Sequence, residues 1–145
     1  MRKVLLPVDG STHAFEAALF LIDLNKSLNG QLEVHILNVE PHPIPWQTHG
    51  VEPETIQDHL AVRAQIAVGP VLQAFQEAGV THLCHTKLGD TAQTIIASAD
   101  EIGCDMIAMG TRGLGGLASL TLGSVTNKVL HQAKVPVICI KAKDE

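Results

Sequence analysis

A glycine-rich segment in the last third of the chain carries the clearest chemical signal. It spans residues 110–124, and Gly110, Gly113, Gly123 and Ser124 follow the pattern glycine, two residues, glycine, nine residues, glycine-serine. Glycines allow a ligand to approach the backbone, and the free N–H groups of a helix starting near Ser124 favour a phosphate. The segment is not a Walker A loop and does not fit G-x-G-x-x-G. It therefore predicts a phosphate-binding loop of another kind, with a surface loop built for turns as the alternative.

Asp9 is the second chemically informative residue. It lies in a turn at residues 8–11, directly after a short apolar run at residues 3–8. Its carboxylate could serve as a base, a metal ligand or an acceptor for ribose hydroxyls. The alternative is a charge stabilised by the start of the next helix. We expect contact with a ligand, because α/β proteins bind ligands beyond the carboxyl ends of their strands.

The eight histidines do not predict a metal site. His82 and His85 are three positions apart on a predicted strand, which turns their side chains to opposite faces. His42 and His49 share a proline-rich segment at residues 41–53, and no carboxylate or cysteine partner is evident for them. We therefore predict neither a metal site nor a catalytic residue set.

Four more side chains are assigned on simple grounds. His13, one turn into a helix, is near the expected ligand crevice, but a solvated side chain is the preferred interpretation. Cys84 and Cys139 lie on predicted strands and are expected to pack as small apolar residues. Trp46 is either an anchor for a partner or a cap over the crevice. With three cysteines, an odd number without close spacing, a disulfide scaffold is excluded.

The elements that must position these residues alternate between strands and helices. Apolar, β-branched runs predict five strands, at residues 3–8, 32–39, 80–86, 106–109 and 137–140. The first helix should bury Phe15, Ala18, Leu19 and Ile22. A second runs from Glu54 to Gly79, kinked or broken at Gly69-Pro70; two more begin near Asp90 and Ser124. This order predicts a doubly wound parallel sheet with helices on both faces.

Length and composition limit the class of protein. The 145 residues suit a single domain, residues 1–145, and 46% hydrophobic residues suffice for a core. A net charge of −5 and 3% aromatic residues argue against nucleic-acid binding. The first apolar run is too short for a signal peptide, and no run reaches the roughly 20 residues of a membrane span. We expect a cytoplasmic protein.

Three stretches together resemble the universal stress protein family in its nucleotide-binding form. They are the glycine pattern described above, the opening Val4-Leu5-Leu6-Pro7-Val8-Asp9-Gly10-Ser11, and the ending from Gly123-Ser124-Val125-Thr126 through Val135-Pro136-Val137. The resemblance covers the whole chain. It implies a Rossmann-like, five-stranded sheet in the order 3-2-1-4-5, a cytoplasmic dimer and a bound adenine nucleotide.

The resemblance also implies which residues meet the nucleotide. Asp9 would lie by the ribose and Val39 by the adenine, while the glycine segment and the helix after it would hold the ribose and phosphates. The complete predicted set is Pro7, Val8, Asp9, Val39, Met109, Gly110, Arg112, Gly113, Gly123, Ser124, Val125 and Thr126.

One departure from the family affects the choice of nucleotide. Members often carry basic residues in the middle of the glycine segment, but residues 116–122 contain none, which leaves Arg112 and Lys128 as the nearby cations. ATP is therefore less favoured over AMP or ADP, and Mg²⁺ would matter more if ATP is used. Three hydroxyls, of Thr111, Ser119 and Thr121, are candidates for phosphorylation by a nucleotide, with water-facing loop residues preferred.

These observations favour a sensor or regulatory module in the stress response, with at most slow ATP hydrolysis or self-phosphorylation. A nucleotidyl-transferase-like enzyme is a second hypothesis, although no H-x-G-H-type motif is present. A third is a nucleotide-free dimeric scaffold that works through the segment at residues 41–53.

The dimer is expected to form through the last strand, at Val137, Ile138 and Ile140, because an apolar edge invites pairing. Shielding of that edge by Lys141, Lys143 and the acidic tail is the alternative.

Overall fold

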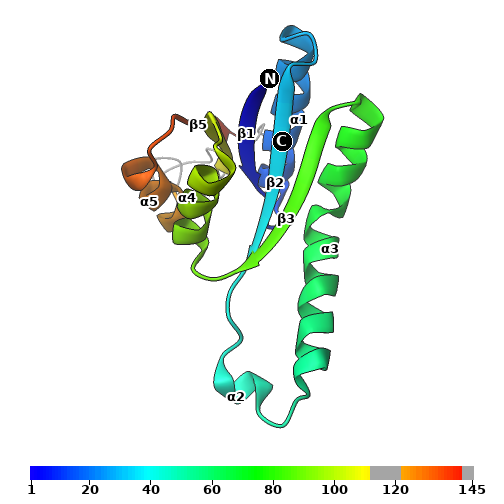
Figure 1. Cartoon of the computed structure of the whole chain (residues 1–145), viewed down its shortest axis with the longest axis vertical. Coiled ribbons are helices and arrows are strands. Elements are labelled where there is room, and N and C mark those ends of the chain that lie inside the picture. Colours follow the sequence, from blue (N-terminus) through cyan, green and yellow to red (C-terminus); the bar gives the residue numbers. More distant parts are fainter. Residues whose placement is uncertain (112–121, 142–145) are drawn as a thin grey trace.

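The computed structural model describes residues 1–111 and 122–141, and only the backbone of residues 46–47. Five parallel strands form one sheet in the order β3-β2-β1-β4-β5, as predicted (Figure 1). The strands are β1 (Arg2–Pro7), β2 (Leu32–Glu40), β3 (Thr81–Leu88), β4 (Met106–Thr111) and β5 (Val137–Lys141). Because the chain runs from β1 outward to β3 on one side and then returns to β4, the strand order reverses between β1 and β4.

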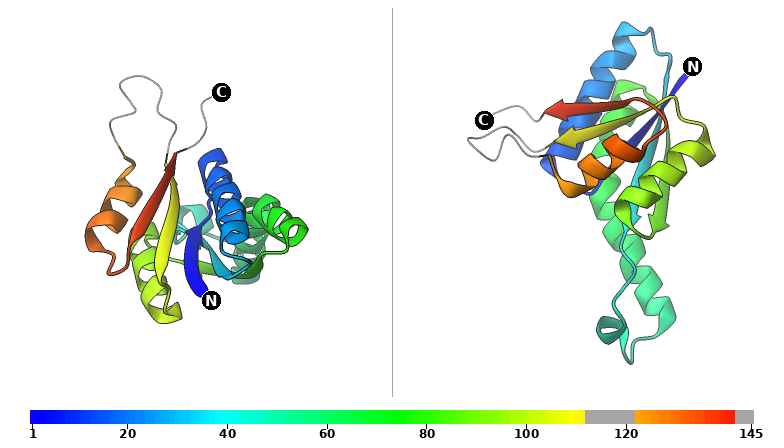
Figure 2. Two further views of the ribbon diagram at one scale, coloured as in Figure 1. Left: turned by 90° about the horizontal axis from the view of Figure 1, so that it is seen from above. Right: turned by 90° about the vertical axis from the view of Figure 1, so that its left-hand side faces the viewer.

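Helices cover both faces of the sheet, again as predicted. They are α1 (Thr12–Ser27), α2 (Pro45–Thr48), α3 (Pro53–Ala78), α4 (Thr91–Ile102) and α5 (Ser124–Gln132). The view in Figure 2 shows α1 and α3 on one side of the strands and α4 and α5 on the other. The short α2 lies within the proline-rich segment and was not predicted. No described helix combines the length and the apolarity that a membrane crossing requires.

The core consists of two apolar layers separated by the sheet. Side chains alternate between the faces of a strand, so Leu5 packs towards α4 and α5 while its neighbour Leu6 packs towards α1 and α3. Phe75 of α3 and Ile95 of α4 are fully buried at the centres of the two layers. This double burial explains why β1 reads as a continuous apolar run rather than an alternating one.

Local signals set the helix ends where the sequence indicates. The hydroxyl of Ser11 accepts a hydrogen bond from the N–H of Ala14 at 3.2 Å and caps α1. The side chain of Asp90 caps α4 in the same way, through the N–H of Gln93. Helix α4 stops at Gly103, which adopts a left-handed conformation that other residues reach only with strain.

The predicted inward face of α1 is only partly right, since Ala18 is buried as expected. The buried residues are Ala14, Ala17, Ala18, Leu21 and Asn25, whereas Leu19 is 38% exposed. Phe15 and Ile22 are only partly buried at the margin of the core. Apolar residues of α1 are distributed around its whole circumference, so several of its faces match the spacing expected of a buried helix face. The small alanines face the sheet because they allow the helix to approach it closely.

Of the kink or break expected at Gly69-Pro70, the break is absent, since α3 is one continuous helix of 26 residues. A proline inside a helix costs about 3 kcal/mol. Burial of Val68 and Val71 on either side of Pro70 offsets this cost. The buried residues of α3 begin at Ala64, and Figure 1 shows the first turns of the helix extending with α2 beyond the end of the sheet.

The two strand cysteines are also not packed as expected. Cys84 and Cys139 are exposed, because β3 and β5 are the edge strands of the sheet and each has one neighbouring strand. Cys104 is buried instead, and burial raises the pKa of its thiol to about 11. A thiol with so high a pKa is protonated near neutral pH and is a poor nucleophile.

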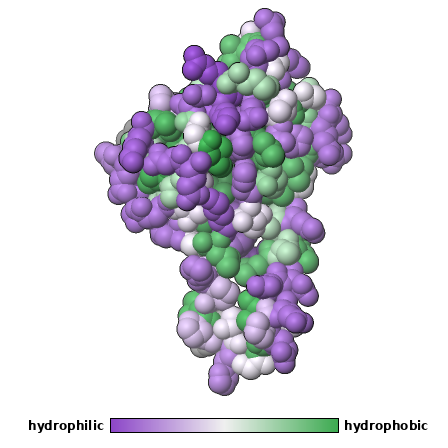
Figure 3. Space-filling view, in the orientation of Figure 1, coloured by the Kyte–Doolittle hydropathy of each residue, from purple (hydrophilic) through white to green (hydrophobic). Residues whose placement is uncertain are grey.

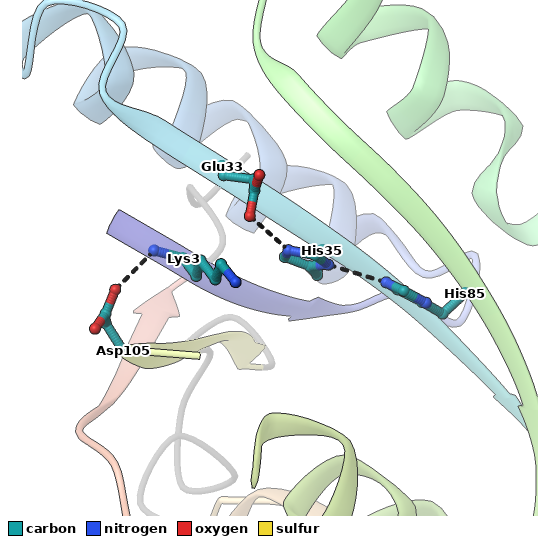
Figure 4. A network of polar contacts seen from close by, with 5 residues as sticks. All are labelled: Lys3, Glu33, His35, His85 and Asp105. Atoms are coloured by element: carbon teal, nitrogen blue, oxygen red, sulfur yellow. Dashed lines mark hydrogen bonds and ion pairs between the residues drawn. The ribbon is translucent and has the colours of Figure 1, made fainter. Parts of the chain in front are cut away.

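A polar network lies on the sheet face that α4 and α5 share (Figure 4). The ring of His35 contacts Glu33 through Nε2 at 2.9 Å and His85 through Nδ1 at 2.9 Å. Burial lowers the pKa of His85, and the charges of His35 and Lys87 lower it further. The folded protein therefore resists protonation of this histidine.

We expect the stability to fall as the pH drops below about 6.5. The unfolded chain binds a proton at His85 more readily than the folded protein, so unfolding takes up a proton and stability is fully present only above the unfolded pKa. The melting temperature should decline between about pH 7.5 and 5.5, and His85→Gln should reduce that slope. Replacing the exposed His59 with glutamine is the matched control. An unchanged slope in His85→Gln would show that other groups cause the effect.

Candidate functional site

A cavity of about 230 Å³ opens at the carboxyl ends of β1 and β4, where the strand order reverses. This is where doubly wound sheets bind ligands. All of the predicted site residues that the structure describes line it: Pro7, Val8, Asp9, Val39, Met109, Gly110, Gly123, Ser124, Val125 and Thr126. Arg112 and Gly113 lie outside the described residues. The structure thus brings four distant stretches of sequence to one cavity.

The carboxyl end of β1 places Asp9 at the cavity. The N–H of Val8 donates to the carbonyl of Leu37 at 2.8 Å, and the buried Asn38 donates through Nδ2 to the carbonyl of Val8 at 3.0 Å. Both bonds hold Val8, the residue that follows β1, against β2. Asp9 then accepts a hydrogen bond from the N–H of Ser11 at 2.9 Å, which orients its carboxylate.

The pKa of Asp9 is lowered although burial alone would raise it. Hydrogen bonds from the side chain and backbone of Ser11 outweigh the burial, and the charge of His13 adds to them. The carboxylate is therefore ionised at neutral pH. An ionised carboxylate accepts hydrogen bonds only, so it suits a ligand that presents hydroxyl groups.

The first turn of α5 supplies hydrogen-bond donors on another side of the cavity. Gly123 is the N-cap residue, and no side chain caps the helix. The first N–H groups of a helix have no partner within it and carry about half a positive charge in total. Gly123 has an ordinary φ of −63°, and no described atom lies within 4 Å of the place where a Cβ would stand. Nothing in the described part of the chain requires glycine here, and the missing side chain leaves space in front of the donors.

Gly110 has a role that the sequence did not indicate. Its position was expected to let a ligand approach, and it does line the cavity. However, a Cβ at this residue would collide with the backbone carbonyl of His13 and stand 3.0 Å from the N–H nitrogen of Ala14. Gly110 therefore allows α1 to begin directly against the end of β4. Its main role is in the packing around the site.

Four lining residues were not predicted: Ala14, Leu37, Thr91 and Ile95. His13 and Thr111 also line the cavity, although solvated side chains were the preferred interpretation for both. Leu37 and Ile95 belong to the apolar core and form a hydrophobic wall. Thr111 is buried, and its hydroxyl donates to the carbonyl of Ile140 at 3.3 Å. The interpretation of Thr111 as a water-facing loop residue is therefore wrong. Ser119 and Thr121 lie outside the described residues.

Metal ligands are not grouped in the described part of the chain. Nowhere in residues 1–111 and 122–141 do three or more histidine, cysteine or carboxylate side chains assemble a site for an ion. His82 and His85 do lie on opposite faces, since His82 packs near Phe75 under α3 while His85 contacts His35 on the other face. The site instead combines a hydrophobic wall, the carboxylate of Asp9 and the first turn of α5, which no side chain caps.

A doubly wound sheet with such a hollow at its switch point is characteristic of a small-ligand-binding α/β protein. The model of the universal stress protein family matches residues 1–141, so the chain belongs to that family. It is similar to a universal stress protein of Methanocaldococcus jannaschii, with 32% identity over 143 residues that cover 97% of this chain and 82% of the relative.

Two solved structures of the family share the fold. One is a family protein of Arabidopsis thaliana with AMP bound, with a TM-score of 0.73, 20% identity and coverage of 99% of this chain and 93% of the other. The second is the universal stress protein of Archaeoglobus fulgidus in complex with dAMP, with a TM-score of 0.68, 21% identity and coverage of 97% and 98%. At these identities the likeness concerns the fold alone.

Proposed function

We propose that this chain binds an adenine nucleotide in the cavity between β1, β4 and α5. One observation carries the proposal: the described residues that the sequence assigns to a nucleotide all line a single hollow. The hydrophobic wall suits a base, Asp9 suits ribose hydroxyls, and the start of α5 suits a phosphate. The AMP and dAMP complexes of two related folds support the same ligand class.

The lining favours AMP or ADP over ATP. Its described residues include no lysine or arginine, and Lys128 lies on α5 without lining the cavity. A triphosphate would need more positive charge than this lining provides, so ATP would require Mg²⁺.

We place the protein in the cytoplasm as a regulatory module of the stress response, in which nucleotide occupancy alters a surface that partners contact. Any hydrolysis or self-phosphorylation would be slow.

The first test is mass spectrometry of the small molecules released when purified, undialysed protein is denatured. Near-stoichiometric AMP, ADP or ATP would support the proposal and identify the occupant. A protein that is empty and also fails to bind added AMP and Mg·ATP would overturn it.

The scaffold hypothesis retains one favourable observation. The segment formed by α2 and the first turns of α3 projects from the sheet, and Figure 3 shows apolar side chains exposed on it. Ile44 is 48% exposed there. A cavity of about 730 Å³ lies between residues 41–51 and the first turns of α3. An empty protein with an intact fold would shift attention to this region.

We further propose that two copies pair through β5. This strand is the edge of the sheet next to β4, and its Val137, Ile138 and Ile140 remain partly exposed. Ile138→Lys should convert a dimer to a monomer in analytical ultracentrifugation, because a buried lysine in the interface would lack a partner. Leu83→Lys on the opposite edge strand is the matched control. A dimer that persists in folded Ile138→Lys would place the interface elsewhere.

A further inference from the structure

His13 stands out among the residues that line the cavity. Within the described lining only Asp9 and His13 can ionise, and His13 alone can become positive. It is the second residue of α1, is partly buried, and its carbonyl faces Gly110 of β4. Its charge also helps to lower the pKa of Asp9, which shows that the two side chains share one electrostatic environment.

A bound phosphate would create an imbalance of charge in this hollow. A phosphate monoester carries about −1.5 to −2 charges at neutral pH. Against it the described lining offers the partial charge of the α5 start, while Asp9 contributes a further negative charge. Since a partly buried anion needs a compensating charge, a proton on His13 is the compensation that the described lining provides.

We propose that His13 contacts the nucleotide phosphate in its protonated form, so that affinity increases as the pH falls towards 6.5. The inference rests on the proposed nucleotide function and deepens it. By linkage, binding of a ligand that favours the protonated histidine is accompanied by uptake of a proton. Asp9 lines the same cavity as His13 and interacts with it electrostatically, and Glu16 lies one turn further along α1. From α4, α5 and β4 the cavity lining presents no titratable side chain among the described residues.

The test measures AMP affinity by calorimetry between about pH 8.0 and 6.5 at constant ionic strength, a range in which AMP remains largely a dianion. The wild-type protein should bind AMP roughly 3- to 10-fold more tightly at the lower pH. His13→Gln should remove this dependence, and His13→Lys should give tight binding that is independent of pH, because lysine stays charged throughout. Adenosine, which has no phosphate, should bind equally at both pH values.

Each outcome separates the inference from the function on which it rests. If AMP binds without pH dependence, or if His13→Gln keeps the wild-type dependence, the role of His13 is wrong and the nucleotide function stands. If neither AMP nor adenosine binds at any pH, the nucleotide function itself fails. Arg112 titrates far above this range, so it does not produce the expected slope. His131→Gln, at the far end of α5, is the matched control, and melting curves verify that each variant is folded.

Discussion

Gly110→Ala should lower the melting temperature by about 10 °C, the largest stability effect that we expect from one methyl group. The added Cβ would collide with the carbonyl of His13, which belongs to the backbone of α1 and has no rotamer that avoids the clash. Helix α1 would have to move away from β4, and overpacking of this kind costs roughly 1–3 kcal/mol or more. Thermal unfolding followed by circular dichroism measures the change.

Gly69→Ala provides the matched control. It makes the same substitution within α3, where no described atom lies within 4 Å of the added Cβ. Alanine is favoured over glycine inside a helix by roughly 0.5–1 kcal/mol, but a Cβ directly before Pro70 disfavours the helical conformation, so the melting temperature should change by only a few degrees. Equal melting temperatures for the wild type and Gly110→Ala would contradict the close approach of α1 and β4.

The fold could be predicted because its main signals are local. A run such as β1 is apolar on both faces, and residues such as Gly103 end a helix whatever its surroundings. The face of α1 could not be predicted in this way. Leu19 and Leu21 are equally apolar, and packing against the sheet selects Leu21 for burial. Likewise, the exposure of Cys139 follows from an edge position that depends on the order of all five strands.

The residues of the site also divide into those that the sequence indicates and those that only the packing of the fold reveals. Asp9, Gly123 and Ser124 could be proposed because their residue types and spacing carry a chemical meaning of their own. His13 and Thr111 were also candidates, but solvated side chains were the preferred interpretation for both, because nothing in the sequence indicates that the first turn of α1 abuts the end of β4. That contact joins residues about a hundred positions apart, and only the folded backbone, with a glycine at Gly110, brings them together.

Gly123→Val should reduce nucleotide affinity by about 100-fold while the fold remains intact. The side chain would fill the space before the first N–H groups of α5, and a phosphate displaced from one or two of these donors loses about 1.5–3 kcal/mol for each bond. Valine can adopt the φ of −63° found at this position, so the backbone needs no rearrangement. Calorimetric titration with AMP measures the loss.

The stability of the same variant separates a ligand role from a structural one. Valine is a poorer N-cap residue than glycine, which costs less than about 1 kcal/mol and shifts the melting temperature by a few degrees. Gly69→Val, in open space on α3, should keep wild-type affinity. Opposite results are therefore expected for these two glycines of the cavity. Gly110→Ala should lower the stability of the fold, whereas Gly123→Val should lower the affinity for the ligand. If Gly123→Val binds AMP as the wild type does, the start of α5 is not the phosphate site, and the space in front of it needs another explanation.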